Sequence, residues 1–415
     1  MQSDAQPRRG AFAFIFVTIL LDMLTLGLIV PVLPKLIVNF LGGDIAEAAR
    51  YSGLFETIWA LMQFAFSPVL GLLSDRYGRR PLILLSNFGT ACDYAIMALA
   101  PTIGWLFVGR IFSGITSASV TTAYAYIADV VPAPKRAGAY GMVGAAFGGG
   151  FVLGPAVGGV LGSMNPRLPF WVAGGLSLLS ALYGFFVLPE SLPPEMRAAR
   201  IAWERANPLG SLRLLRSHAQ LFGLAAAVFL TDVAHQVLPN VFVLYTIYRY
   251  GWSESVIGLT LAWVGVWSIV ISGFGVKPIV ARLGEQRALL VGLLCGALGF
   301  AIYGLAPNGT LFWLGTPVMA FWGLASPASQ ALMTHRMESS AQGELQGALG
   351  SMNGVAMLIG PALFTQTFSL LIGPGNHPNL PGAPWFLATL LMLAALVVVW
   401  RAIAPAASLS GERCA

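Results

Sequence analysis

The chain has 415 residues, of which 57% are hydrophobic and only 10% are charged. Soluble proteins carry roughly 25% charged residues, and a chain of this length could not cover its surface with so few. The composition excludes a soluble enzyme, a nucleic-acid-binding protein and a disordered chain, although a net charge of +6 would suggest nucleic acid in a soluble protein. The remaining class is an all-α membrane protein that crosses the bilayer many times.

Apolar runs long enough to cross a bilayer recur along the whole chain. A spanning helix needs about 20 mainly apolar residues, and a helix satisfies its own backbone polar groups in lipid. The first run is too long for the apolar core of a secretion signal, so we expect it to be retained. The sequence predicts twelve spans, at 11–36, 51–74, 82–101, 105–129, 138–162, 168–188, 219–246, 255–276, 288–306, 311–332, 343–372 and 384–403.

The basic residues indicate the orientation of these spans. If the N-terminus is cytoplasmic, most of the 23 lysine and arginine residues fall in cytoplasmic loops. Because positively charged loops tend to stay inside, this bias predicts an even number of spans with both termini cytoplasmic. The exceptions are Lys35, Arg50, Arg167 and Arg249 on the outer side and Arg110 within a span.

A polar connection separates two similar halves of the chain. Residues 190–217 are rich in Arg, Glu and Pro, and we expect them to form a cytoplasmic linker between six-helix bundles at 1–189 and 218–415. Gly154-Pro155-Ala156 in the first half recurs as Gly360-Pro361-Ala362 in the second. Parallel repeats of this kind are typical of transporters in which two bundles rock around a central site.

Ionisable side chains inside a membrane are costly and are therefore functional candidates. Polar neighbours at helical spacing suggest that they line a water-accessible cavity. Burial disfavours a charged carboxylate, so such a group can bind and release a proton under the control of a nearby arginine. The alternative is a buried ion pair that only fixes helix packing. The predicted proton-coupling residues are Asp22, Glu56, Asp93, Arg110 and Asp232, and the predicted substrate cavity contains Gln63, Asn87, His235, Gln236, Asn240, Trp263 and Trp267.

A charged motif connects the second and third spans. It reads Gly71-Leu-Leu-Ser-Asp75-Arg76-Tyr-Gly78-Arg79-Arg80-Pro81, and Gly78 permits a tight turn at its centre. Asp129 ends the fourth span on the same side of the membrane. The motif predicts a conformational gate, an ion-pair cluster that holds one conformation and breaks in the other. The alternative is a plain basic loop.

The fifth span is rich in glycine. Small residues let helix backbones approach closely, and a proline inside a helix adds a kink. The glycine-rich motif of this span consists of Gly144, Gly148, Gly154, Pro155, Gly158 and Gly159.

Motifs for other chemistry do not occur in the sequence. It contains no Gly-x-x-x-x-Gly-Lys-Ser/Thr loop for a nucleotide. The four histidines, His218, His235, His335 and His377, are scattered without the spacing of metal ligands. We therefore expect no cofactor and no metal, and neither an ATP-driven pump nor a membrane-embedded enzyme.

Together these motifs resemble those of the major facilitator superfamily. The Gly71–Pro81 loop is similar to its signature loop, Arg110 with Gly114 to its span-4 motif, and the fifth-span glycine motif to its antiporter motif. The chain most resembles the tetracycline-resistance exporters among the 12-span drug exporters, through Leu21-Asp22, Pro31-Val-Leu-Pro34, Ala60-Leu-Met-Gln63-Phe, Cys92-Asp93-Tyr94 and Gly251-Trp252-Ser253.

This resemblance implies a two-bundle drug/proton antiporter in the bacterial cytoplasmic (inner) membrane, associated with multidrug resistance. Its partners would be protons, membrane lipid and a small amphipathic substrate, either tetracycline-like or cationic, and it would act as a monomer. A proton-coupled uptake symporter of the same fold is the alternative. The functionally important positions of the subfamily match Asp22, Gln63, Asp75, Arg79, Asp93, Arg110 and Asp129.

The sequence also departs from the exporter pattern. Gly296 stands where the exporters carry an acidic residue in span 9, and Ser268 stands where they carry a histidine in span 8. Ala281 matches Asp75 in the second-half copy of the loop motif. These changes argue against transport of tetracycline as a metal chelate.

Other positions carry polar groups where apolar or neutral residues are expected. These are Glu56, Asp232 and His235. A shifted set of acidic groups suggests a cationic substrate, on which Trp263 and Trp267 could stack. The alternative role of the two tryptophans is packing.

Overall fold

The computed structural model describes residues 9–117, 119–200, 219–337, 342–373 and 379–403, and the regular elements in these ranges are all helical. Eleven helices in these ranges are long and apolar enough to cross a membrane. The tenth predicted span is present as three consecutive shorter pieces, α15, η5 and α16. The predicted all-α fold with twelve spanning segments is thereby confirmed.

The helices follow the predicted spans with small differences at their ends. In the first half they are α1 (Arg9–Ile29), α2 (Leu33–Phe40), α3 (Ile45–Tyr77), α4 (Arg79–Leu99), α5 (Ile103–Thr116), α6 (Ser119–Val130), α7 (Ala133–Met164), α8 (Leu168–Val187) and the short η1 (Pro194–Met196). In the second half they are α10 (Ala219–His235), α11 (Val237–Tyr250), α12 (Glu254–Ile269), η4 (Val270–Gly275), α13 (Val276–Leu283), α14 (Glu285–Leu305), α15 (Gly309–Ala320), η5 (Phe321–Leu324), α16 (Ala325–Thr334), α17 (Gln342–Ile372) and α18 (Ala383–Ile403).

These helices pack into two compact units. The first unit contains the described part of Met1–Pro208 together with Pro239–Val266 and Pro361–Asn379. The second contains the described parts of Leu209–Leu238, Trp267–Gly360 and Leu380–Ala415. The division of the chain into six-helix bundles at 1–189 and 218–415 therefore remains a prediction. Most of the predicted linker at 190–217 lies outside the described residues.

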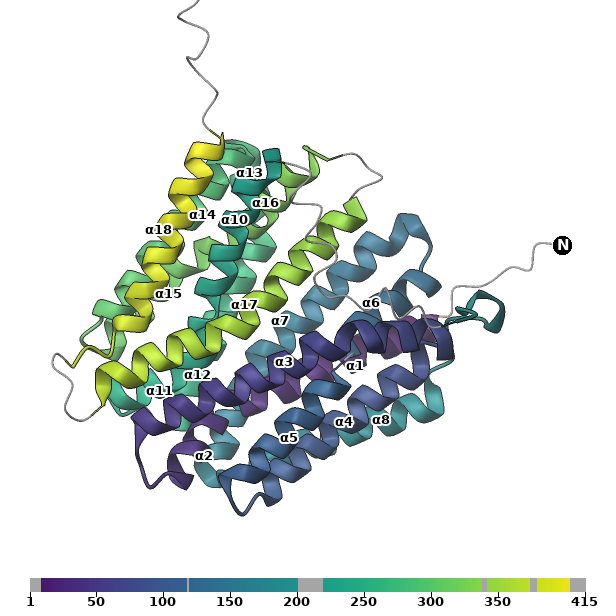
Figure 1. Cartoon of the computed structure of the whole chain (residues 1–415), viewed down its shortest axis with the longest axis horizontal. Helices are drawn as coiled ribbons and strands as arrows, with labels where there is room; N and C mark the ends of the chain where they lie inside the picture. Colours follow the sequence, from purple (N-terminus) through teal and green to yellow (C-terminus); the bar gives the residue numbers. More distant parts are fainter. Residues whose placement is uncertain (1–8, 118, 201–218, 338–341, 374–378, 404–415) are drawn as a thin grey trace, which may run out of the picture. The chain divides into compact units, whose positions relative to one another are not determined.

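In the first unit α4 lies between α5 and α8, and α1 lies along α7 (Figure 1). The contact between α1 and α7 is close because glycines face it. A methyl group added to Gly154 would lie 2.7 Å from Gly27 Cα, and one added to Gly150 would lie 2.6 Å from Met23 Cβ. Both distances are too short for any side chain, so the two backbones pack directly against each other.

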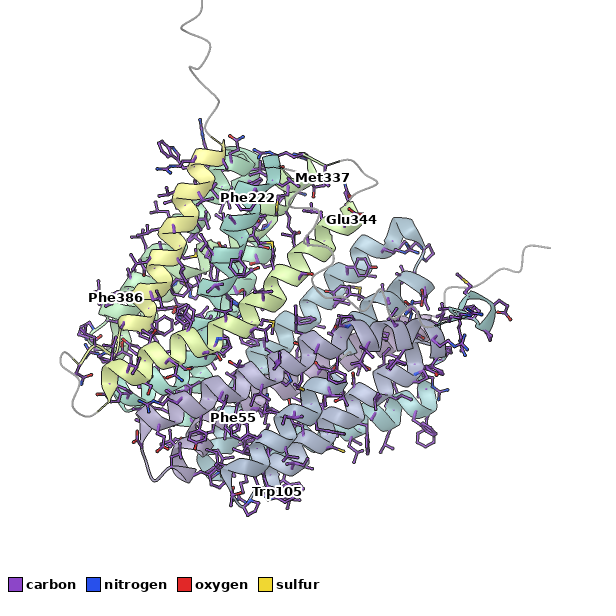
Figure 2. The ribbon with its side chains drawn as sticks, viewed as in Figure 1. Phe55, Trp105, Phe222, Met337, Glu344 and Phe386 are labelled. Carbon is purple, nitrogen blue, oxygen red and sulfur yellow. The ribbon has the colours of Figure 1, made fainter. Side chains whose placement is uncertain are left out.

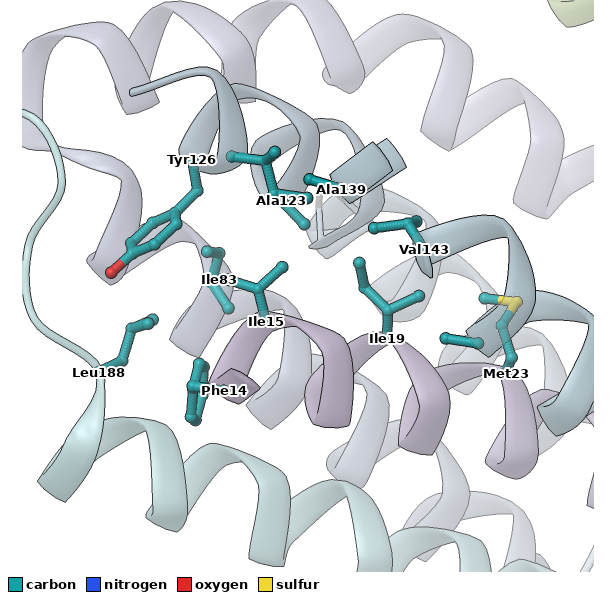
Figure 3. Close-up of a cluster of buried hydrophobic side chains, with 12 residues drawn as sticks. Phe14, Ile15, Ile19, Met23, Ile83, Ala123, Tyr126, Ala139, Val143 and Leu188 are labelled. Atoms are coloured by element: carbon teal, nitrogen blue, oxygen red, sulfur yellow. The ribbon is translucent and has the colours of Figure 1, made fainter. Parts of the chain in front are cut away.

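An apolar cluster fills this unit near the Gly78 turn. It combines residues of α1, α4, α6 and α7 with Leu188, which follows α8 (Figure 3). Tyr126 belongs to the cluster, and its hydroxyl donates a hydrogen bond to the Pro189 carbonyl at 3.0 Å. The chain that leaves α8 is therefore fastened to the bundle.

In the second unit α14 packs against α15, α16 and α18, and α10 packs against α18 (Figure 1). Aromatic rings fill one end of this bundle. Tyr303 and Phe312 stack with centroids 4.0 Å apart, and Tyr303 and Trp385 meet in a T-shaped arrangement with centroids 5.4 Å apart. The Phe386 ring (Figure 2) covers Gly304, where an added methyl group would lie 2.8 Å from the ring.

The outward-facing surface of both units is apolar. Phe186 is 79% exposed, Phe274 is 75% exposed and Leu314 is 66% exposed. Large exposed apolar surfaces are rare in soluble monomers and mark contact with lipid or a partner. Together with the length of the helices, this surface identifies an integral membrane protein.

Candidate functional site

A buried charge cluster joins three helices of the first unit. Nη2 of Arg110 on α5 lies 3.7 Å from Oδ2 of Asp93 on α4, and Nη1 lies 3.8 Å from Oε1 of Glu56 on α3. The Asp93 side chain is 1% exposed, whereas that of Glu56 is 34% exposed. Two carboxylates around one guanidinium leave one negative charge in excess. The cluster can therefore bind a proton and still keep its arginine paired.

Tyr94 connects this cluster to α1. Its side chain is buried, lies beside Thr25 and is within electrostatic range of Asp22, Asp93 and Arg110. Three of the predicted proton-coupling residues thus lie around one tyrosine. Tyr94 was not among the predicted site residues, because a tyrosine in an apolar run gives no signal of its own beyond its position next to Asp93.

The amides predicted to line the cavity have different surroundings. Gln63 on α3 donates a hydrogen bond to Ser117 Oγ at 2.9 Å, next to the end of α5. Asn87 is buried between α4 and α8 and donates to Ser180 Oγ at 3.1 Å. The contact of Asn87 favours a role in helix packing, while Gln63 stays a candidate for the substrate cavity.

The loop motif forms an ion-pair cluster at one end of the unit, here called the Gly78 end. Arg79 Nη1 lies 2.5 Å from Asp75 Oδ1, and Arg79 Nε lies 3.3 Å from Asp129 Oδ2. Gly78 turns the chain between α3 and α4 with a φ of 108°, which disfavours any other residue. The structure thus brings together the charged residues that the sequence predicted to form the gate.

Two further arginines of the motif bind backbone carbonyls. Arg76 donates to the Ala198 carbonyl at 2.8 Å, and Arg80 donates to the Phe185 carbonyl. Gly71 of the same motif makes no close contact, because a methyl group added there would have no atom within 4 Å. Its role in the gate is not explained by a contact in the first unit.

Glu190 binds the Gly78 turn beside this ion-pair cluster, and it was not among the residues predicted from the sequence. Its Oε1 accepts hydrogen bonds from the backbone N–H groups of Arg79, Ser191 and Leu192 at 2.8–3.0 Å, and its Oε2 accepts one from Arg80 at 3.2 Å. A carboxylate at the start of α4 satisfies amides that lack helical partners and complements the helix dipole. Glu190 therefore holds the chain after α8 against the Gly78 turn.

The fifth-span motif faces two helices. Gly154 and Gly158 face α1, whereas Gly159 faces Gly258 of α12, whose Cα lies 3.1 Å from an added methyl group. Pro155 lies inside α7. No atom lies within 4 Å of the corresponding position at Gly144. The close contacts therefore belong to the second half of α7.

The end of the first unit opposite Gly78, here called the Lys35 end, is held by contacts between distant segments. Lys35 Nζ lies 3.6 Å from Glu254 Oε1, at the start of α12. Arg50 on α3 donates a hydrogen bond to Ser369 Oγ on α17 at 2.8 Å. These two contacts connect α12 and α17 with the helices of the first half of the chain within the first unit.

The predicted polar residues of span 7 are divided by a break in the helix. Asp232 and His235 lie in the last turn of α10, and Gln236 interrupts the helix before α11 begins. The His235 ring lies 5.3 Å from the Trp322 ring of η5, measured between centroids. These residues all belong to the second unit, as does Trp267, whereas Asn240 and Trp263 belong to the first.

The structure gives a reason for the departure at Gly296. A methyl group at this position would lie 3.1 Å from Trp322 Cγ and 2.5 Å from the Met392 methyl. Trp322 and Met392 thus fill the space that an acidic side chain would need. No group of three or more metal-ligating side chains lies together in the described ranges.

Comparisons with known proteins agree with this architecture. A profile of the Major Facilitator Superfamily matches residues 15–361. The class C tetracycline resistance protein of Escherichia coli is 35% identical over 94% of this chain and 97% of its own length. The class G protein of Vibrio anguillarum is also 35% identical, over 92% of this chain and 95% of its own.

Solved structures show the same fold. The crystal structure of the human organic anion transporter MFSD10 has a TM-score of 0.70 at 24% identity and covers 95% of this chain and 99% of its own. The crystal structure of the nucleoside transporter NupG has a TM-score of 0.73 at 13% identity, with coverage of 95% and 98%. Fold, matching profile and relatives define a membrane transporter of small molecules. The chain belongs to the major facilitator superfamily.

Proposed function

We propose that this transporter exports a small amphipathic compound in exchange for protons. The observation that carries the proposal is the position of Arg110 between Glu56 and Asp93 within the membrane-spanning helices. An ion pair that only fixed packing would need a single carboxylate. The second carboxylate leaves an uncompensated charge, which is costly in a membrane unless a proton neutralises it.

In this proposal Glu56 and Asp93 bind the proton and Arg110 changes its pairing when they do. Protonation of one carboxylate leaves Arg110 held by the other, which loosens the contact among α3, α4 and α5. Asp22 acts on the same cluster through Tyr94, which lies near both. Asp232, the remaining predicted residue, lies in the second unit and is not part of this cluster.

The gate at the Gly78 end is proposed to control access from the cytoplasm. Arg79 and its two carboxylate partners would separate when that side opens, and Glu190 would keep the start of α4 in place. The basic loops favour a cytoplasmic position for this end and for both termini. The bacterial relatives support a location in the bacterial inner membrane, and we propose a functional monomer.

Export is preferred over uptake because of the relatives. Proteins named for tetracycline resistance are 30–35% identical to this chain over most of its length. The filled space at Gly296 argues that the substrate differs from theirs. A proton-coupled uptake symporter with the same charge cluster is the alternative, and direction of transport separates the two.

A growth assay tests the proposal. An efflux-deficient bacterial host would express the wild-type chain, the Asp22→Asn variant or the Arg110→Ala variant against a panel of amphipathic antibiotics and dyes. Export predicts that the wild type protects the host against at least one compound and that both variants lose protection at equal expression. Greater sensitivity of the host expressing the wild type would favour uptake. Equal protection by both variants would refute the coupling role.

A further inference from the structure

Three irregular stretches of helix lie in the second unit. In span 7 the Gln236 N–H bonds to the Val233 carbonyl at 3.0 Å, three residues back instead of four. Span 8 contains the π-helix η4, and span 10 contains the 3₁₀-helix η5. The last two touch, because a methyl group at Gly323 would lie 2.9 Å from Ser272 Oγ. Such interruptions of long helices are frequent at functional sites.

Asp232 lies one turn before the break in span 7. Its carboxylate takes part in no salt bridge or hydrogen bond with any residue that the structure describes. The other carboxylates of the second unit, within the described ranges, are Glu285 and Glu344 at the starts of α14 and α17. A half-buried carboxylate in a membrane span is costly unless it binds a proton or a cation.

Aromatic rings surround His235, which lies on the same face of α10 as Asp232. His235 is three residues after Asp232 and therefore shares its face of α10. The His235 ring lies 5.3 Å from Trp322, and Trp322 lies 5.7 Å from Phe300, measured between centroids. Trp322 keeps this position because Gly296 leaves room for it. A carboxylate that shares a helix face with a histidine packed against a tryptophan suits an organic cation that carries a flat ring.

We propose that Asp232, His235 and Trp322 form a subsite for the protonated amine of an aromatic substrate. Asp232 pairs with the ammonium group, while Trp322 and His235 contact the ring. The inference rests on the proposed function in one respect, since it names the class of compound that the transporter carries. It differs from the proton site at Arg110, because it lies in the other unit and its carboxylate has no arginine partner.

A matched pair of fluorescent probes tests the subsite. Dansylcadaverine carries a protonated amine on a dansyl ring, and its N-acetyl derivative has the same ring without the charge. Binding of each probe to the purified full chain in detergent is followed by dansyl fluorescence, with no proton gradient present. We expect the wild type to bind the amine about tenfold more tightly than the acetylated probe, as for a hydrogen bond to a charged group.

Substitutions then separate charge from packing. Asp232→Asn should remove the preference for the amine and change binding of the acetylated probe less than about twofold, while Asp232→Glu should retain the preference. Trp322→Leu should weaken binding of both probes. Two control variants should bind both probes like the wild type. Glu344→Gln removes an exposed carboxylate (Figure 2), and Trp313→Leu replaces a tryptophan that is 42% exposed.

Several results would overturn the subsite. They are equal affinity of the wild type for the two probes, no measurable binding of the amine, and an unchanged preference in Asp232→Asn. An equal loss of both probes in Asp232→Asn would also overturn it, since a merely structural role predicts that pattern. The assay contains no proton gradient, so it can fail while proton-driven export holds. Export can likewise fail in cells while the probe preference holds.

Discussion

Arg110 is bound differently by its two carboxylates. Asp93 is almost completely buried, whereas Glu56 is one-third exposed, although both lie less than 4 Å from the guanidinium. Glu56 is the more accessible of the two carboxylates, so under the proposed function we expect a proton to enter the cluster there. In the proposed function Asp93 would be the inner partner that holds Arg110 when Glu56 is neutral.

The first prediction concerns this arginine. Arg110→Ala leaves two carboxylates without a counter-charge and should lower the free energy of unfolding by about 3–5 kcal/mol, as for other broken buried ion pairs. Thermal unfolding of the purified protein in detergent measures the loss. Arg249→Ala, at an exposed arginine near the end of α11, should change stability little.

A double substitution separates stability from function. Arg110→Ala combined with Asp93→Asn should recover much of the stability, because it removes a buried charge together with its partner, but it should not restore transport. If Arg110→Ala alone kept the stability and the transport rate of the wild type, the cluster would be needed neither for folding nor for transport.

At the scale of elements, the contact between α1 and α7 depends on glycine. Gly154→Ala would place a methyl group 2.7 Å from Gly27 Cα, so the helices must separate. We expect a loss of about 1–3 kcal/mol in unfolding free energy and slower transport. Gly144→Ala on the same helix meets no atom within 4 Å and should leave both quantities unchanged. Similar losses in both variants would mean that α7 is sensitive to helix composition and not to this contact.

The start of α4 gives the third prediction. Glu190→Ala removes the acceptor for the backbone N–H groups of Arg79 and Arg80 and should cost about 1–2 kcal/mol, comparable to the loss of a helix cap. Thermal unfolding and transport rate should both fall. Glu195→Ala is the control, since Glu195 is exposed in η1. A transport rate equal to wild type in Glu190→Ala would remove Glu190 from the gate.

At the scale of the whole molecule, packing does not simply follow chain order. Parts of α11, α12 and α17 belong to the first unit, where Glu254 of α12 contacts Lys35 and Ser369 of α17 contacts Arg50. The Lys35 end and the Gly78 end are thus held by different sets of charged residues. In the proposed alternating access, the contacts at one end would break when that end opens, while the contacts at the other end stay formed.

The orientation of the chain can be tested by labelling. In a variant in which Cys92, Cys295 and Cys414 are replaced by serine, single cysteines would be introduced as Thr102→Cys and Glu195→Cys. A maleimide that cannot cross the membrane should label Thr102→Cys in intact cells, because the loop after α4 is expected outside. Glu195→Cys should react only after permeabilisation. The reverse pattern would invert the proposed topology.

Part of this architecture could be predicted from the sequence. Apolar length is a local property, so all twelve spans were recognisable, and the Gly78 motif placed Asp75 and Arg79 beside a turn. Contacts between distant residues could not be predicted. Glu190 binds amides more than one hundred positions away, and Trp322 fills the space at Gly296. The break of span 10 at η5 was also missed, because its composition is as apolar as that of an unbroken helix.

The central claim is that proton binding at Glu56 and Asp93 drives export, and inside-out membrane vesicles test it most directly. When respiration acidifies the vesicle interior, addition of a transported compound should raise the interior pH, measured with quinacrine fluorescence, while the compound accumulates inside. Asp93→Asn should abolish both signals at equal expression. Movement of the compound out of the vesicles together with protons, or proton-driven accumulation by Asp93→Asn, would contradict the account.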